Sequence, residues 1–212
     1  MNRMRLIKIS FVAAPAFLFL YGIAHAIDGL DGNYGPGLAW TVGHIMFLCA
    51  LVMFGVVIVG LYSRIQGGTM WRTVIARCAL VVSLIGLITF IQSPIVDIIA
   101  GLRAPDHAAM GALQSQLNSY PNTPVSPYYN FGPLLFQLGL LVLMLQLAIL
   151  KPRQIPWWSP AMLLLGFLVL GFDLDLLPLG AILVGIALYN SGYEDYSRSE
   201  KARSSRRRIV RF

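Results

Sequence analysis

The sequence predicts an all-α integral membrane protein built as a bundle of six transmembrane helices, with the N- and C-termini in the cytoplasm. The first observation behind this prediction is composition: the 212 residues are 57% hydrophobic and 12% charged, whereas soluble domains carry about 25% charged residues. The mean hydropathy is +0.71. The second is that the apolar residues form runs of the length that crosses a bilayer, about 17–25 residues. The third is the distribution of charge between these runs.

The apolar runs place the six spans at about 7–29, 38–63, 73–102, 131–150, 158–172 and 174–190. The first four are long enough to cross a bilayer. The last two reach only about 25 Å each at the helical rise of 1.5 Å per residue, so they either thin the bilayer or are partly re-entrant. These spans form one transmembrane domain, residues 1–192, followed by a tail at 193–212.

Basic residues support an even number of spans. With the N-terminus inside, all of the sixteen Lys and Arg residues except Arg103 fall on the cytoplasmic side of the predicted topology, as the positive-inside rule requires. The net charge of +7 therefore reflects topology in a multi-pass protein of the cell membrane and not nucleic-acid binding. The predicted partners are the lipid bilayer and other membrane proteins. The basic tail is expected to be disordered.

Acidic residues and histidines show the opposite bias. Outside the tail, all of them fall at or near the outer face: Asp28, Asp31, Asp97, Asp106, Asp173 and Asp175, together with His25, His44 and His107. One alternative concerns the first span, because Ala24-His25-Ala26 has the form of a signal-peptidase site and a cleaved signal peptide would remove His25. Retaining this span gives the even count.

The outer loop at 103–130 is the one large connection. Asp106 is a suitable N-cap for a short helix with Ala109, Leu113 and Leu117 on one face. The proline- and tyrosine-rich segment that follows is either a lid over the outer mouth or a passive strap at the membrane interface.

Two histidines lie at similar depth on the first two spans. His25 and Asp28 share one face of the first span, and His44 lies near the start of the second. The short turn between the spans makes them antiparallel neighbours, so His25 and His44 are expected to face each other. Three chemistries fit such a pair: axial ligation of a b-type haem, binding of a transition metal with Asp28 or Asp31, and uptake of a proton. The alternative is that each histidine satisfies ordinary polar partners.

Asp97 and Gln137 are further candidates. Asp97 follows Pro94 in the third span and has Ser93 on the same face; an acid at membrane depth predicts an ion or proton site. It could equally pair with Arg103. Gln137 in the fourth span is either a site residue or a hydrogen-bonding contact between helices.

No HExxH, GxSxG or Walker A motif is present, which favours a protein that is not an enzyme. The leading hypothesis is therefore a polytopic membrane protein that binds or passes a small ligand, ion or proton through an outward-facing polar pocket. Its predicted lining is His25, Asp28, His44, Asp97 and Gln137. The alternatives are a haem- or metal-binding redox subunit that uses His25 and His44, and a structural or accessory subunit of a larger membrane complex.

Overall fold

The computed structural model describes residues 3–65, 69–119, 131–149, 154–189 and 191, and these residues are helical apart from short connections, with no strand among them. The prediction of an all-α protein is confirmed. The helices are α1 (Arg3–Asp28), α2 (Leu38–Arg64), α3 (Met70–Arg103), α4 (His107–Asn118), α5 (Gly132–Ile149) and α6 (Ser159–Phe172), with 3-10 turns η1 (Gly29–Asp31) and η3 (Leu174–Leu176). Residues 177–189 continue directly from η3 and are called the last helix below.

Four helices, α1, α2, α3 and α5, are long and apolar enough to cross a membrane. Helix α6 and the segment Leu174–Tyr189 are apolar but shorter, and the 14 residues of α6 extend only about 21 Å against a hydrocarbon thickness of about 30 Å. Large apolar side chains stay exposed along the helices, including Val52, Ile88 and Leu138. Exposed apolar faces of this extent are typical of a surface that lipid covers, so these helices indicate a membrane protein.

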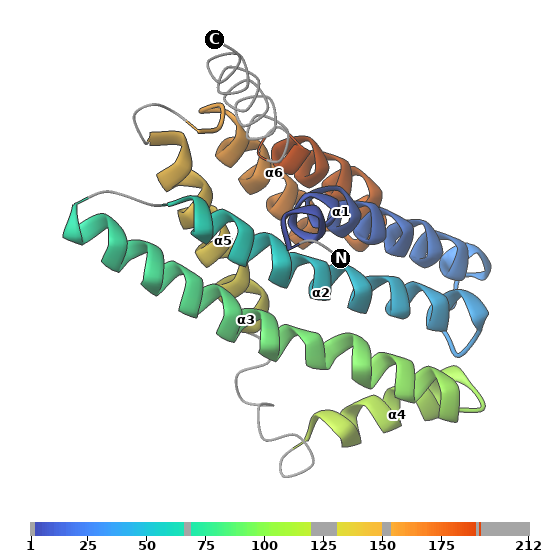
Figure 1. The fold of residues 1–212 in the computed structure, drawn as a ribbon. Helices are drawn as coiled ribbons and strands as arrows, with labels where there is room; N and C mark the ends of the chain where they lie inside the picture. The colour runs from blue at the N-terminus through green and yellow to red at the C-terminus, as the bar shows by residue number, and fades with distance from the viewer. Residues whose placement is uncertain (1–2, 66–68, 120–130, 150–153, 190, 192–212) are drawn as a thin grey trace.

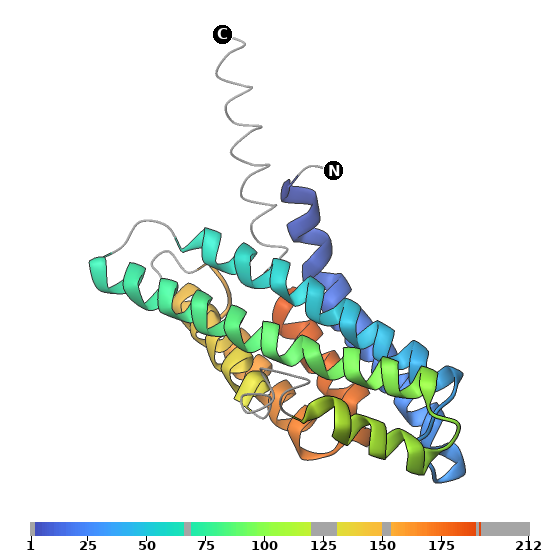
Figure 2. The same cartoon turned by 90° about the horizontal axis from the view of Figure 1, so that it is seen from below.

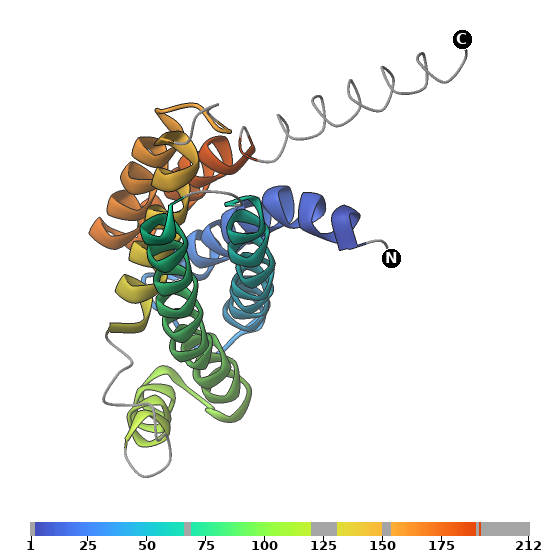
Figure 3. The ribbon, with the colours of Figure 1, turned by 60° about the vertical axis from the view of Figure 1, so that its left-hand side comes forward.

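The apolar helices form a closed circuit of neighbours. Helix α1 packs along α2, α2 along α3, α3 along α5, and α5 against α6 (Figure 1). The circuit closes where the last helix meets α1, because Pro178 lies against Gly22 and Pro15 lies beside Gly185. Figure 3 looks nearly along α2 and α3, with α1 on one side of them and α5 and α6 on the other.

Helices α3 and α5 approach each other closely because glycines line their contact. A Cβ atom on Gly86 would lie 2.3 Å from the backbone nitrogen of Phe136, and one on Gly139 would lie 2.6 Å from the carbonyl oxygen of Ala79. The hydroxyl of Ser83 uses this proximity to donate a hydrogen bond of 3.0 Å to the Phe136 carbonyl. Small residues that allow backbones to touch are the usual basis of helix association in lipid.

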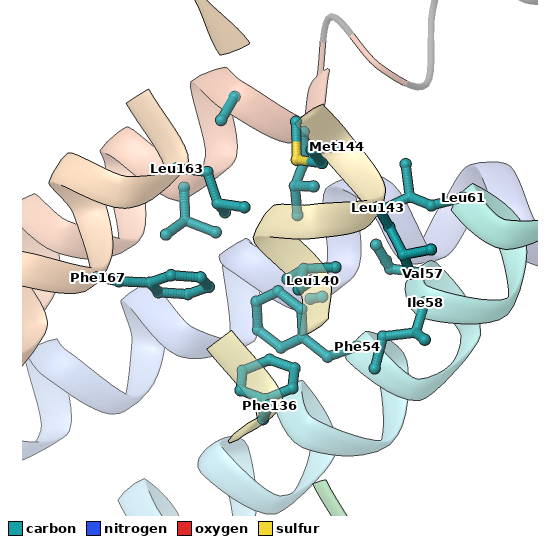
Figure 4. Packing of buried hydrophobic residues seen from close by; sticks show 14 of the residues in the cluster. Phe54, Val57, Ile58, Leu61, Phe136, Leu140, Leu143, Met144, Leu163 and Phe167 are labelled. Carbon is teal, nitrogen blue, oxygen red and sulfur yellow. The ribbon is translucent and has the colours of Figure 1, made fainter. Parts of the chain in front are cut away.

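A dense apolar core fills the bundle between α2, α5 and α6. Its centre contains side chains of all three helices that are almost completely buried, and Figure 4 shows them interdigitating: Phe54, Val57, Ile58, Leu61, Phe136, Leu140, Leu143, Met144, Leu163 and Phe167. The core lies towards the end of the bundle where α2 finishes. The opposite end, where α1 turns into α2, is less completely filled.

The predicted short helix in the outer loop is present as α4. The Asp106 carboxylate accepts a hydrogen bond of 2.8 Å from the backbone N–H of Ala109, which is the expected N-cap. Helix α4 folds back antiparallel along α3 (Figure 2), because Gln114 contacts Asp97 and Asn118 contacts Gln92. The lid or strap segment at 120–130 and the predicted disordered tail at 193–212 lie outside the described residues.

The close contact of α3 and α5 predicts that Gly86→Ala destabilises the protein. The new methyl group must push two helix backbones apart, at a cost of about 1–3 kcal/mol. We expect a lower thermal unfolding temperature in detergent or nanodiscs. The control is Gly111→Ala in α4, where a Cβ meets nothing within 4 Å and alanine favours the helix. Equal unfolding temperatures for the two variants would contradict the proposed packing.

Candidate functional site

A cavity of about 820 Å³ lies at the end of the bundle where α1 turns into α2. Every apolar helix of the circuit contributes residues to its wall. Four of these residues, His25, Trp40, Pro133 and Phe172, lie near helix ends on this side of the bundle. Its lining comprises Leu18, Tyr21, His25, Tyr34, Trp40, His44, Phe47, Leu51, Phe54, Phe90, Ser93, Asp97, Pro133, Phe136, Gln137, Phe167, Leu170, Gly171, Phe172, Asp173, Leu174, Asp175 and Leu177.

The cavity changes character with depth. Its base is apolar and consists of buried side chains, including Leu51, Phe54 and Phe136, which also belong to the core. Its rim contains exposed residues, among them Asp173 and Asp175. The cavity therefore leads from an exposed acidic mouth to a water-poor aromatic base, a combination that suits a ligand with one polar end and one apolar end.

His44 and Asp97 form the polar centre of one wall. The two side chains approach to 3.5 Å between His44 Nε2 and Asp97 Oδ2, and the His44 side chain is almost fully buried. The other imidazole nitrogen, Nδ1, lies 2.8 Å from the carbonyl oxygen of Trp40. The Asp97 carboxylate also accepts hydrogen bonds of 2.7 Å from Gln114 and 3.4 Å from Ser93. Partners from three helices thus satisfy a carboxylate inside the apolar bundle, as such a group requires.

Local geometry in α2 and α3 brings this pair together. Trp40 and His44 are one turn apart, so both face α3. The indole N–H of Trp40 donates a hydrogen bond of 2.9 Å to the carbonyl oxygen of Asp97. The indole reaches it because position 101 is glycine: a Cβ there would lie 2.4 Å from the Trp40 ring.

His25 lies in the same cavity but does not pair directly with His44. Its ring stacks on Tyr34, with centroids 4.5 Å apart and planes 10° apart. Tyr21 lies beside both imidazoles, at 6.1 Å from the His25 centroid and 5.3 Å from that of His44. Both histidines therefore line one cavity, and the ring of Tyr21 lies beside each of them.

Tyr34 joins three separate parts of the rim. Its hydroxyl donates a hydrogen bond of 3.2 Å to Asp175 Oδ1, its ring stacks on His25, and its carbonyl oxygen contacts Nδ1 of His107 at the start of α4. Partial burial, and next the negative charge of Asp175, raise the pKa of the Tyr34 hydroxyl above its ordinary value. The hydroxyl therefore stays protonated at neutral pH and remains a donor.

Asp28 and Gln137 have different surroundings. The Asp28 carboxylate accepts a hydrogen bond of 3.3 Å from the backbone N–H of Gly35, so it holds the turn after α1; it is not among the residues that line the cavity. The Gln137 side chain does line the cavity, and it makes no hydrogen bond with the part of the chain that the structure describes. Its amide is therefore available to a ligand.

The arrangement does not favour metal or haem ligation by His25 and His44. No group of three or more His, Cys, Asp or Glu side chains within the described ranges is close enough to hold a metal ion. Both ring nitrogens of His44 already face protein groups, the Asp97 carboxylate and the Trp40 carbonyl. The donor set that the metal hypothesis needs is not assembled here.

Four residues of this site were not singled out from the sequence: Gln114, Tyr34, Asp173 and Asp175. The signal for the two acids was their position, because the first and last outer turns each contain two aspartates followed by proline and glycine. Nothing in the local pattern of α4 distinguishes Gln114 from Gln116. Its contact with Asp97 depends on α4 folding back along α3.

Removing the Gln114 amide should loosen α4. In Gln114→Leu the Asp97 carboxylate loses its shortest hydrogen bond, worth about 1 kcal/mol or more, and we expect backbone amides of α4 to exchange hydrogen roughly fivefold faster. Hydrogen–deuterium exchange measured by mass spectrometry checks this. Ser115→Ala is the control, since that side chain is exposed on the same helix. Equal exchange in the two variants would refute the role of the contact.

The polar features of the cavity are the His44–Asp97 pair, the Gln137 amide and the acidic rim. Comparisons of the chain with protein-family models, with curated proteins and with solved structures found no match.

Proposed function

We propose that this protein is a six-span, multi-pass protein of the cell membrane that binds a small ligand in the cavity from the outer side. Four long and two shorter apolar helices in sequence support the six spans, and the distribution of basic residues supports a topology with both termini inside. In this orientation the turn between α1 and α2, the start of α4 and the cavity mouth face outward. The partner that surrounds the protein is the lipid bilayer.

The observation that carries the proposal is the cavity itself. Pockets for small ligands have volumes of about 300–1,000 Å³ and combine apolar walls with a few fixed polar groups. This cavity has a volume of about 820 Å³ and a lining of that kind. The amide of Gln137 supports a bound ligand in particular, because it is half-exposed in the cavity wall and can donate to or accept from a ligand there.

The packing beneath the cavity favours binding over passage. Phe54, Phe136 and Phe167 close its base, and the core below them contains fully buried Leu140 and Leu143 (Figure 4). An ion would have to cross this apolar layer to reach the other end of the bundle. A site that opens at one end is therefore the form of the proposal that the geometry supports best.

The His44–Asp97 pair has a second role in this proposal, which is to exchange a proton when the ligand binds. An imidazole beside a carboxylate can take up and release a proton, and here the Asp97 carboxylate lies 3.5 Å from the His44 ring. A ligand that enters beside the pair alters its contact with water and thus its proton affinity. Helix α4 covers the pair from the outside through Gln114.

A larger side chain inside the cavity should weaken ligand binding. We expect Leu170→Trp to weaken the binding of arylalkyl probes at least tenfold, because the larger side chain occupies part of the cavity that Leu170 lines. Isothermal titration of nanodisc-embedded protein with a water-soluble arylalkyl alcohol and with its trimethylammonium counterpart measures this, with empty nanodiscs correcting for partition into lipid.

The matched control is Leu168→Trp on the same helix, where the side chain is 61% exposed on the outer surface of the bundle; it should bind as the wild type does. Thermal unfolding of both variants establishes that they fold. If the wild type binds neither probe above the empty-nanodisc level, or if the two variants bind equally well, cavity binding is wrong.

Proton exchange can be read from the same calorimetry. The enthalpy of probe binding, measured in buffers of different ionisation enthalpy, should vary with the buffer for the wild type and become constant for Asp97→Asn, which keeps the shape of the side chain but not its charge. Asp106→Asn is the control, because asparagine also caps α4. A wild-type enthalpy that does not depend on the buffer, or an unchanged dependence in Asp97→Asn, rules out proton coupling through this pair.

A further inference from the structure

The cavity is acidic although the chain is basic. The sequence contains 16 Lys and Arg against 9 Asp and Glu, yet the cavity lining includes Asp97, Asp173 and Asp175 and no Lys or Arg. Arg103, the last residue of α3, is exposed and does not line the cavity. A bound anion would therefore face carboxylates without a permanently charged partner.

The two rim carboxylates have acceptor capacity to spare. Asp173 Oδ1 accepts a hydrogen bond of 3.0 Å from the backbone N–H of Asp175, and Asp175 Oδ1 accepts one of 3.2 Å from Tyr34. Neither second oxygen, Oδ2, is hydrogen-bonded to any described residue. Both side chains are exposed at the cavity mouth, where a ligand can reach them without displacing a protein contact.

Aromatic side chains line the walls between the mouth and the base. Tyr21, Tyr34, Trp40 and Phe172 lie on four different segments around the upper part of the cavity. The faces of such rings attract cations, with quaternary ammonium groups bound especially well. Carboxylates at the rim with aromatic walls below them form a chemical environment that attracts a cation and accepts its alkyl substituents.

The other titratable groups of the wall do not reverse this preference. A protonated His44 is neutralised by Asp97 at 3.5 Å. His25 is the one remaining imidazole in the lining, and Asp173 and Asp175 together outweigh one imidazolium charge. The base of the cavity, with Leu51, Phe54 and Phe136, suits an apolar body and offers nothing to a strongly hydrated inorganic ion.

We propose that the ligand class is a small organic cation, in which an ammonium head binds at the rim between Asp175 and the aromatic walls and an apolar body reaches the base. This proposal rests on the proposed binding in the cavity and specifies the ligand for it. The head replaces its water with carboxylate and ring contacts, and the body leaves water for the apolar base, which favours binding through the hydrophobic effect.

The test is a charge series with one aryl chain. Nanodisc-embedded protein is titrated with an arylalkyl trimethylammonium salt, with the alcohol of the same chain and with the corresponding carboxylate, again against empty nanodiscs. We expect the cation to bind at least tenfold more tightly than the alcohol and the carboxylate to bind most weakly. Asp175→Asn combined with Asp173→Asn should weaken the binding of the cation at least fivefold more than the binding of the alcohol.

Asp106→Asn is the control, because it removes an exposed carboxylate from the same end of the protein but outside the cavity. If alcohol and cation bind equally, or the carboxylate binds best, the cation proposal fails while cavity binding stands. If no member of the series binds, both proposals fail. If Asp106→Asn weakens the cation as much as the double variant does, the attraction is a general surface effect and the site at the rim is refuted.

Discussion

The contact between His44 and Asp97 is the constraint on which the cavity end of this protein depends. A carboxylate among apolar helices must be satisfied by neighbouring groups, because lipid supplies no hydrogen bonds. Asp97 obtains its partners from α2 through His44, from its own helix through Ser93 and from α4 through Gln114. The requirement therefore sets α2 against α3 and holds α4 back along α3. The same contacts form one wall of the cavity. The Asp97 carboxylate therefore both holds the helices together and takes part in the proposed proton exchange.

The cavity exists because the two ends of the bundle pack differently. Towards the end where α2 finishes, buried apolar side chains of α2, α5 and α6 fill the space between these helices. At the other end, the contacts between helices are polar and directional: Tyr34 reaches Asp175 and Trp40 reaches the Asp97 carbonyl. Directional contacts hold the helices at a fixed separation without requiring the volume between them to be filled. Short helices such as α6 (Ser159–Phe172) leave the mouth exposed on that side.

Charge separation gives the proposed orientation a functional consequence. Basic residues collect at the end that the topology assigns to the cytoplasm, and positive residues there direct insertion. Acidic residues contribute little to insertion, so their concentration at the other end, around the cavity mouth, calls for a separate reason. Recognition of a cation supplies one, since Asp173 and Asp175 lie at the mouth with one oxygen each available. The same distribution would attract cations from the outer solution and disfavour anions.

The sequence by itself determined the protein class and the positions of its helices. In lipid, the backbone N–H and C=O groups of a long apolar run must hydrogen-bond to each other, and a helix achieves this. Length and composition were therefore enough to predict α1, α2, α3 and α5 and the two shorter helices. Local rules were also enough for the Asp106 cap of α4. Tertiary structure alone decided which polar groups meet. Asp28 turned out to hold a turn through Gly35, while Gln114 contacts Asp97 and Tyr34 contacts Asp175, 141 residues away in the chain. The physical reason is that helix periodicity determines which residues share a face, whereas the partner across a gap depends on how close the backbones come, and here glycines such as Gly101 and Gly86 set that distance.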